Sequence, residues 1–431
     1  MVHPHLGGLS SSGLGATDLG NVSILGGLSR EFYHRIYQHY QQVGAWNWQT
    51  RASYGQAGSA FNAITETASF FEPKVAEAIF SQFLTEQNVP VITGRLDLAA
   101  GIVMNAGKIS HLRLEDGREF SGRMFIDASY EGDLLPGAGV AFAVGREANV
   151  TYHETYNGIQ AALATNNQLG NGINPYVTAG NAASGLLSGV AADAGGTDGS
   201  GDTKLQAYCF RMVLTDVAAN RVMIPQPAGY NEADYELLFR AIEAGQTSNF
   251  FKLSYPMDSH NVQRHVKNGM VKNEGNVQMA VSKPYPISYR SIIPKRGECS
   301  NLLVPWSLSA THMAFGSIRM EPVFMGLSQS AAIAASMAID RDIAVQDLAY
   351  AVLRPALLTV GCALGDPVTE PPTTIVDNTD SGLVTLTDSR TSATTAAGFI
   401  GTDYLHDGFT GQGTRQAFYR IPSGLTGAAA N

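Results

Sequence analysis

The chain has 431 residues, of which 44% are hydrophobic and 15% charged, with a formal net charge of -9. This length is enough for two or three domains with a large core. The acidic balance argues against nucleic acid or an anionic membrane as the main partner. No apolar run approaches the roughly 18–20 residues of a membrane span, the longest being residues 331–339.

The cysteines and the N-terminus narrow the chemistry further. Cys209, Cys299 and Cys362 are far apart, and an iron–sulfur cluster normally needs four cysteine ligands. His3 and His5 lack the further ligands that a metal site requires, so no metal is expected. The first residues do not resemble a signal peptide. The compartment therefore stays open, with an extracytoplasmic or secreted location as a guess, and the oligomeric state is unknown.

Glycines and apolar periodicity predict the elements in chain order. Gly7, Gly8, Gly13 and Gly15 lie close together in a Leu-rich segment, which is either a flexible tail or a loop that hugs a cofactor. Helices are predicted over residues 28–43, from 73 onward, and over 231–244, 324–339 and 345–358. Strands are predicted over residues 89–92, 101–105, 109–114, 118–126 and 205–215, with a strand–turn–strand unit over 285–305.

The composition changes after residue 365. Residues 370–374 form a stiff Pro-rich linker, and short alternations of β type follow it. About 57 residues remain after the linker, which is few for an independent β unit.

Five segments carry a family resemblance, in the family's order and spacing. The most informative is Phe125-Ile126-Asp127-Ala128-Ser129-Tyr130-Glu131-Gly132-Asp133-Leu134, which reads as a buried strand ending in a small-residue turn. The other four lie in residues 5–13, 71–76, 206–230 and 309–329. Together they resemble the FAD-dependent oxidoreductase family whose members are often labelled xanthan-lyase-like. Residues 375–378 with 398–404 resemble the first half of a golvesin-type β-sandwich.

The resemblance implies an α/β, two-dinucleotide-binding flavoprotein fold of glutathione-reductase type with an incomplete N-terminus. The expected domains are an FAD-binding domain over 1–140, a substrate or cap domain over 141–285, the return of the FAD-binding domain over 286–365, and a linker with a partial β-sandwich over 366–431. The family's first strand and glycine fingerprint, which normally hold the pyrophosphate, are expected before His5 and are absent. The late helix has Leu327-Ser328-Gln329-Ser330-Ala331 where the family usually carries Gly-Gln-Ala-Ala-Gly.

The resemblance also implies a site for FAD. A flavin needs close backbone approach, a positive end near its N1 and C2 carbonyl, and a shielded face. A loop at Gly7 and Gly8 would supply the first, and the N-terminus of the helix near Met325 the second. The ordinary alternatives are simple turn glycines and close helix packing. The candidate cofactor-binding residues are Leu6, Gly7, Gly8, Ser11, Gly13, Ala128, Ser129, Glu131, Met325 and Gln329.

Two residues are candidates for catalysis. His312 would act as a general base for a hydroxyl proton, and Arg319 would bind an acidic or hydroxylated substrate or stabilise the reduced flavin. Arg146 and Arg211 are candidates for the substrate pocket. The ordinary alternatives are a local hydrogen bond for His312 and structural ion pairs for the three arginines.

These features predict hydride transfer between an organic substrate and FAD, with a small molecule or a saccharide as partner through family association. One alternative is a non-catalytic carbohydrate- or surface-binding protein with a degenerate flavoprotein shell. A polysaccharide lyase is less favoured, because the sequence shows no recognisable pattern of a base beside a group that neutralises a carboxylate. The chain lacks the G-x-S-x-G, H-E-x-x-H and P-loop motifs, so hydrolase, metalloprotease and NTPase functions have no support.

Overall fold

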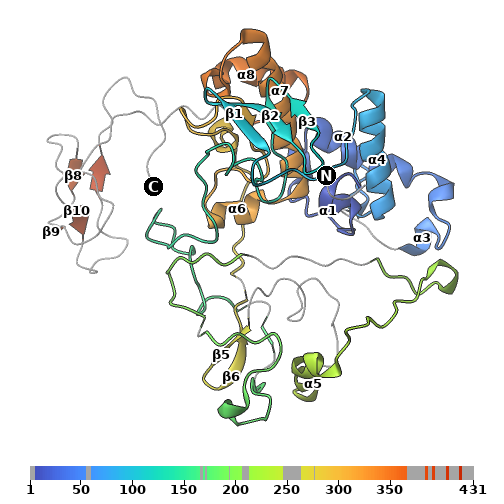
Figure 1. Ribbon diagram of the computed structural model, residues 1–431, viewed down its shortest axis with the longest axis vertical. Helices are drawn as coiled ribbons and strands as arrows, with labels where there is room; N and C mark the ends of the chain where they lie inside the picture. Colours follow the sequence, from blue (N-terminus) through green and yellow to red (C-terminus); the bar gives the residue numbers. More distant parts are fainter. Residues whose placement is uncertain are drawn as a thin grey trace. The chain divides into compact units, whose positions relative to one another are not determined.

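The computed structural model describes most of the chain before residue 366 and four short strands after it. The described residues are 5–54, 60–165, 168–169, 172–193, 195–205, 213–245, 264–275 and 277–365, with the backbone of 384–386, 391–393, 404–406 and 417–419. The contacts divide the chain into two units, Met1–Ala363 and Leu364–Asn431 (Figure 1).

The first unit contains helices throughout and strands in small sheets. Its helices are α1 (Gly8–Ser11), α2 (Gly27–His39), α3 (Arg51–Tyr54), α4 (Pro73–Glu86), α5 (Glu236–Glu243), α6 (His312–Ile318), α7 (Glu321–Arg341) and α8 (Tyr350–Thr359). Its strands are β1 (Ile102–Asn105), β2 (Lys108–Arg113), β3 (Glu119–Ser121), β4 (Phe125–Ile126), β5 (Arg264–Lys267), β6 (Met270–Asn273) and β7 (Leu302–Leu303).

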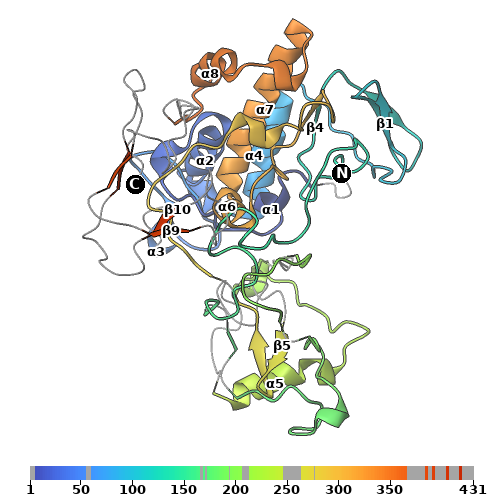
Figure 2. The ribbon, with the colours of Figure 1, turned by 90° about the vertical axis from the view of Figure 1, so that its left-hand side faces the viewer.

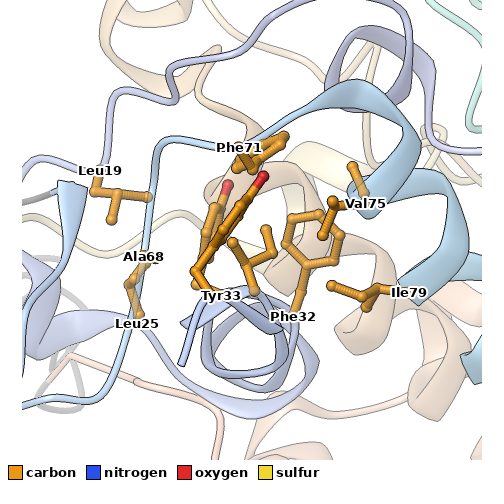
Figure 3. Packing of buried hydrophobic residues seen from close by; sticks show 11 residues of the cluster. Leu19, Leu25, Phe32, Tyr33, Ala68, Phe71, Val75 and Ile79 are labelled. Carbon is orange, nitrogen blue, oxygen red and sulfur yellow. The ribbon is translucent and has the colours of Figure 1, made fainter. Parts of the chain in front are cut away.

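Helix α2 packs against both α4 and α7 (Figure 2), and aromatic side chains fill its contact with α4. Phe32 is fully buried and stacks on Phe80 of α4, with ring centroids 4.7 Å apart. Val75 and Ile79 of α4 point toward Phe32 (Figure 3). These residues recur at the spacing of one helical face, so burial of apolar surface explains why both helices form and pair.

Helix α7 is the long element of the first unit. Four alanines on one of its faces are buried, namely Ala331, Ala334, Ala335 and Ala338. Small side chains allow close approach to α2, α8 and β4. Within the described part of the chain, α7 alone has the length and apolar composition to cross a membrane, and a third of that stretch is buried. A core helix passes the same test, so the described residues contain no clear membrane span.

Two sheets meet at Asn301. Strands β1, β2 and β3 form an antiparallel meander, and β4 pairs in parallel with β7. Asn301 is buried and precedes β7; its side chain accepts from Ile109 N at 2.8 Å and donates to Ile109 O at 2.9 Å. The same amide donates to Arg123 O at 3.2 Å. One side chain therefore joins the meander to the parallel pair.

The hairpin β5–β6 and the second unit complete the described strands. In β5–β6 the turn is Asn268-Gly269, both with positive φ, as a two-residue hairpin turn requires. In the second unit, β8 (Val384–Leu386) pairs antiparallel with β11 (Ala417–Tyr419), and β9 (Thr391–Ala393) with β10 (Tyr404–His406).

The predicted helices are confirmed, and several predicted strands are not. Pro73 begins α4 as expected, and the last two predicted helices are α7 and a short 3-10 turn followed by α8. The strand predicted over 89–92 is wrong, because that segment is irregular and its Val89, Val91 and Ile92 are exposed. The run 118–126 is split into β3 and β4, which join different sheets. The unit over 285–305 contains a 3-10 turn and β7, and most of the 205–215 strand lies outside the described residues.

Replacing Asn301 by Ala tests the junction of the two sheets. We expect Asn301→Ala to lower the free energy of unfolding by about 2–5 kcal/mol, because each buried polar group left without a hydrogen-bond partner costs about 1–3 kcal/mol. Denaturant unfolding measures the change, with Asn220→Ala at an exposed position as the control. Equal stability of the two variants would contradict the role of Asn301 in joining the two sheets.

Enlarging one buried alanine tests the packing of α7. We expect Ala334→Leu to destabilise the first unit by about 1–3 kcal/mol through overpacking. The exposed Ala332 lies on the same helix, so Ala332→Leu is the matched control and should change stability by less than about 0.5 kcal/mol. Thermal unfolding compares them, and an unchanged midpoint for Ala334→Leu would refute close packing at this face.

Candidate active site

The turn after β4 is organised by two side chains. Asp127 is buried, and its carboxylate accepts from Ser129 N at 2.9 Å, Ser129 Oγ at 2.7 Å and Leu134 N at 2.8 Å. The Ser129 hydroxyl in turn accepts from Gly132 N at 3.1 Å and Asp133 N at 2.9 Å. The predicted small-residue turn is therefore present, and the Ser129 hydroxyl takes part in its closure.

The N-terminal segment of residues 6–13, called the glycine loop below, contacts this turn through Tyr130. The Leu9 backbone N–H donates to the Tyr130 hydroxyl at 2.8 Å. A Cβ on Gly8 would lie 2.5 Å from the same hydroxyl, and a Cβ on Gly7 would lie 2.3 Å from the Phe80 ring. Both glycines have positive φ. They thus permit close approach by the protein's own side chains, whereas the ordinary alternative weighed for them was a simple turn of the chain.

The other predicted loop residues have local roles. The Ser11 hydroxyl donates to the carbonyls of Leu6 and Gly8, which closes the loop on itself. Gly13 has a φ of 115°, a conformation that favours glycine. Ala128 and Glu131 are exposed beside the β4 turn.

An aromatic series connects the turn to the start of α7. Tyr130 meets Trp306 edge-on with centroids 4.8 Å apart, and Trp306 stacks on Phe324 at 4.2 Å. Ser307 Oγ donates to the Tyr130 carbonyl at 3.0 Å. Burial and the nearby Glu321 carboxylate raise the pKa of Tyr130 to about 12, so its hydroxyl stays protonated at neutral pH. The structure therefore brings the loop, the β4 turn and α7 together.

Helix α7 carries the last two predicted cofactor residues. Met325 packs against the α2–α4 core, and Gln329 accepts from Leu28 N at 2.8 Å at the start of α2. A Cβ on Gly27 would lie 2.0 Å from Gln329 Oε1, and Gly27 has a φ of 53°, a conformation that favours glycine. Glu321 is buried in the first turn of α7, where its charge offsets the positive end of the helix dipole.

His312 is the first residue of α6, which follows β7. Its backbone N–H donates to Glu147 Oε1 at 2.9 Å, and its side chain is exposed. Desolvation by the surrounding protein and the Arg146 guanidinium lower the pKa of His312, against the effect of nearby carboxylates. Its imidazole is therefore neutral, and able to accept a proton, over a wider pH range than a free histidine.

The three predicted arginines lie in different settings. Arg146 forms a two-pronged ion pair with Asp202, at 3.0 and 2.8 Å, and a further contact to Glu274. This is the structural role weighed as its alternative, and it places Arg146 near His312. Arg319 ends α6 and is exposed, with no carboxylate partner within the described part of the chain. Arg211 lies outside the described residues.

Two buried serine hydroxyls bear on whether a polar cofactor fits. Ser10 of α1 and Ser29 of α2 are 0% and 2% exposed, and neither hydroxyl has a hydrogen-bond partner among the described residues. A buried hydroxyl normally has a partner. These two are available to polar atoms of a bound molecule or to water.

Two surface hollows lie along α2, and the first includes Gly27, which faces Gln329. One, of about 340 Å³, is lined by Arg30, His34, Thr65 and Glu66. The other, of about 600 Å³, lies along α2 and α4 and has a mixed polar and apolar lining. Tyr130, Trp306 and His312 line neither of these two hollows. Among the described residues, no group of three His, Cys, Asp or Glu side chains could hold a metal ion.

Comparison with protein families decides the class of protein. The family model described as FAD dependent oxidoreductase matches residues 2–254 and 252–357. The chain belongs to the FAD dependent oxidoreductase family. Its fold class is accordingly the dinucleotide-binding α/β fold, its cofactor is FAD and its class of activity is oxidoreductase. No curated protein and no solved structure matched the chain.

Sequence reasoning missed Tyr130, Trp306 and Glu147. Tyr130 stands inside the quoted motif, and its contacts with Leu9 N and Trp306, both distant in sequence, distinguish it from a surface tyrosine. Trp306 follows the apolar run of β7 and carried no sequence signal. The hydrogen bond of Glu147 to His312 links residues 165 positions apart.

Removing one hydroxyl tests the link between the glycine loop and the β4 turn. We expect Tyr130→Phe to speed amide hydrogen exchange over residues 8–12, because Leu9 N–H loses its acceptor while the ring still packs on Trp306. Exposed Tyr152 provides the control variant Tyr152→Phe. Unchanged exchange at Leu9 in Tyr130→Phe would show that the contact does not order the loop.

Proposed function

We propose that this FAD dependent oxidoreductase catalyses hydride transfer between an organic alcohol and FAD, with sugar-derived alcohols as candidate substrates. The observation that carries the proposal is the placement of His312 on the helix that directly follows β7, in a chain of this family. Ligands of open α/β folds bind beyond the carboxyl ends of the strands. The Tyr130 turn follows the carboxyl end of β4, and the segment 304–311 leads from the carboxyl end of β7 to α6.

The proposed cofactor site comprises the glycine loop, the β4 turn and the start of α7. When bound, FAD supplies the hydride acceptor. Ser10 and Ser29 add buried hydroxyls that lack partners among the described residues, which fits hydrogen bonding to a polar cofactor. The residues proposed to hold the cofactor are Leu6, Gly7, Gly8, Ser11, Gly13, Ala128, Ser129, Glu131, Met325 and Gln329.

His312 is the proposed base that takes the substrate's hydroxyl proton. A lowered pKa keeps the imidazole neutral at physiological pH, as the role requires. Arg319 is proposed to bind an acidic or hydroxylated substrate, and its exposure without a carboxylate partner in the described residues supports this. Arg146 and Arg211 complete the proposed substrate side, Arg146 through its position near His312.

The domain assignments belong to the same proposal. A substrate or cap domain over residues 141–285 would be inserted between β4 and β7. The xanthan-lyase-like label and a partial golvesin-type β-sandwich over 366–431 rest on the sequence resemblance. The two antiparallel pairs in the second unit support the β character of that segment.

Replacing His312 tests the proposed chemistry. We expect His312→Asn to lower kcat for alcohol oxidation by about 10²- to 10⁴-fold, the usual contribution of a general base, while flavin content stays unchanged. The measurement is anaerobic bleaching of the flavin absorbance with a panel of sugars and sugar alcohols.

The exposed His153 provides a matched control, and His153→Asn should bleach like the parent protein. Bleaching of His312→Asn at the parent rate would remove His312 from the mechanism. A colourless, well-folded protein that does not take up added FAD would contradict the proposal as a whole.

A further inference from the structure

The start of α6 is held by a carboxylate from a distant segment. Glu147 Oε1 accepts from the His312 backbone N–H at 2.9 Å and from Asn157 Nδ2 at 2.8 Å. Desolvation raises the pKa of Glu147, but these hydrogen bonds and the nearby His312 outweigh it, and the net pKa is lowered. Glu147 is therefore an anion at neutral pH.

Asn157 fixes the orientation of two carboxylates at once. It is fully buried, and its amide also donates to Glu154 Oε2 at 3.1 Å, while its side-chain oxygen accepts from Gly158 N at 2.9 Å. A flipped amide would place the oxygen against both carboxylates, so the network itself assigns the orientation. Each carboxylate consequently has a set position.

Glu154 holds the residue before His312. Thr311 Oγ1 donates to Glu154 Oε1 at 2.9 Å and accepts from Ala314 N at 3.1 Å as the cap of α6. Thr311 and His312 are thus each bound by one glutamate. The two glutamates differ in one respect that an experiment can use, because Glu147 binds His312 itself and Glu154 binds its neighbour.

We propose that Glu147 is a positioning residue for His312, setting the direction of the imidazole from α6 and placing an anion beside it. The inference rests on the proposed function, in which His312 takes the hydroxyl proton. Glu147 does not touch the substrate in this account. It acts on His312 by holding the backbone N–H that begins α6 and by its charge.

The charge of Glu147 predicts the direction in which the pKa of His312 should move when that charge is removed. An anion beside His312 favours the imidazolium, so Glu147 raises the pKa of His312 while desolvation and Arg146 lower it. Removing the anion shifts the titration of His312 to lower pH. The charged groups that face His312 are Arg146, Glu147, Asp202 and Glu274, and Glu154 lies behind Thr311.

The test uses the full-length protein and the variant Glu147→Gln, which keeps an oxygen acceptor for both N–H groups but removes the charge. Titration of ¹⁵N-histidine-labelled protein by NMR follows the His312 imidazole, which is assigned by its loss in His312→Asn. We expect the imidazole titration and the acid limb of kcat/KM to move to lower pH together. An unmoved titration, or a shift to higher pH, would overturn the proposal.

Glu154→Gln is the matched control, since it removes an equal charge from the same Asn157 amide. It should weaken the cap of α6 but move the His312 titration less than Glu147→Gln does. Equal shifts in both variants would reduce Glu147 to one charge among several and overturn its special role. If Glu147→Gln does not fold, Glu147→Asp is the second variant, because it keeps the charge on a shorter side chain. We expect its His312 resonance to change position while the midpoint of the His312 titration stays close to that of the parent protein. A midpoint that moves as far as loss of the charge would move it counts against the proposal.

The two proposals fail differently. A shifted His312 titration in Glu147→Gln, together with full turnover in His312→Asn, would sink the proposed function and leave the positioning intact. A large loss of turnover in His312→Asn with an unmoved titration in Glu147→Gln would do the reverse.

Discussion

The parallel pairing of β4 with β7 is the constraint on which the rest of the site depends. Phe125 lies opposite Leu302 and Ile126 opposite Leu303, so segments almost 180 residues apart end at the same edge. Two residues per strand give few backbone hydrogen bonds. Asn301 compensates by binding the meander and the β3–β4 connection with one buried amide. A buried amide with all its partners in place is specific as well as stabilising.

Two sets of contacts then connect the loops beyond that edge. Aromatic packing connects Tyr130, Trp306 and Phe324, and so relates the glycine loop to α7. Carboxylate hydrogen bonds connect Glu147 and Glu154 to the start of α6. The first set is aromatic, whereas the second keeps charge close to an exposed histidine. Such a division, with an apolar side for a flat cofactor and a polar side for the proton, suits the chemistry proposed here.

The sequence predicted the elements whose signals are local. The apolar spacing of α2, α4 and α7 and the position of Pro73 depend on residues within one or two turns. The strand predicted at 89–92 was wrong because a short apolar run does not show whether another strand will pair with it, and this segment does not pair. Asn268-Gly269 was a readable hairpin signal that went unused. Among site residues, the β4 turn was predictable from its small residues. The ion pairs of Arg146 and the contact of Tyr130 with Leu9 were not, since each joins distant segments.

A structure of the protein with FAD bound is the most direct test of the central claim, that the cofactor site lies at the carboxyl edge of β4 and β7. Density for FAD bounded by the glycine loop, the Tyr130 turn and the start of α7, with the open side of the flavin toward α6, is the result we expect. FAD bound with none of these segments in contact with it would contradict the account.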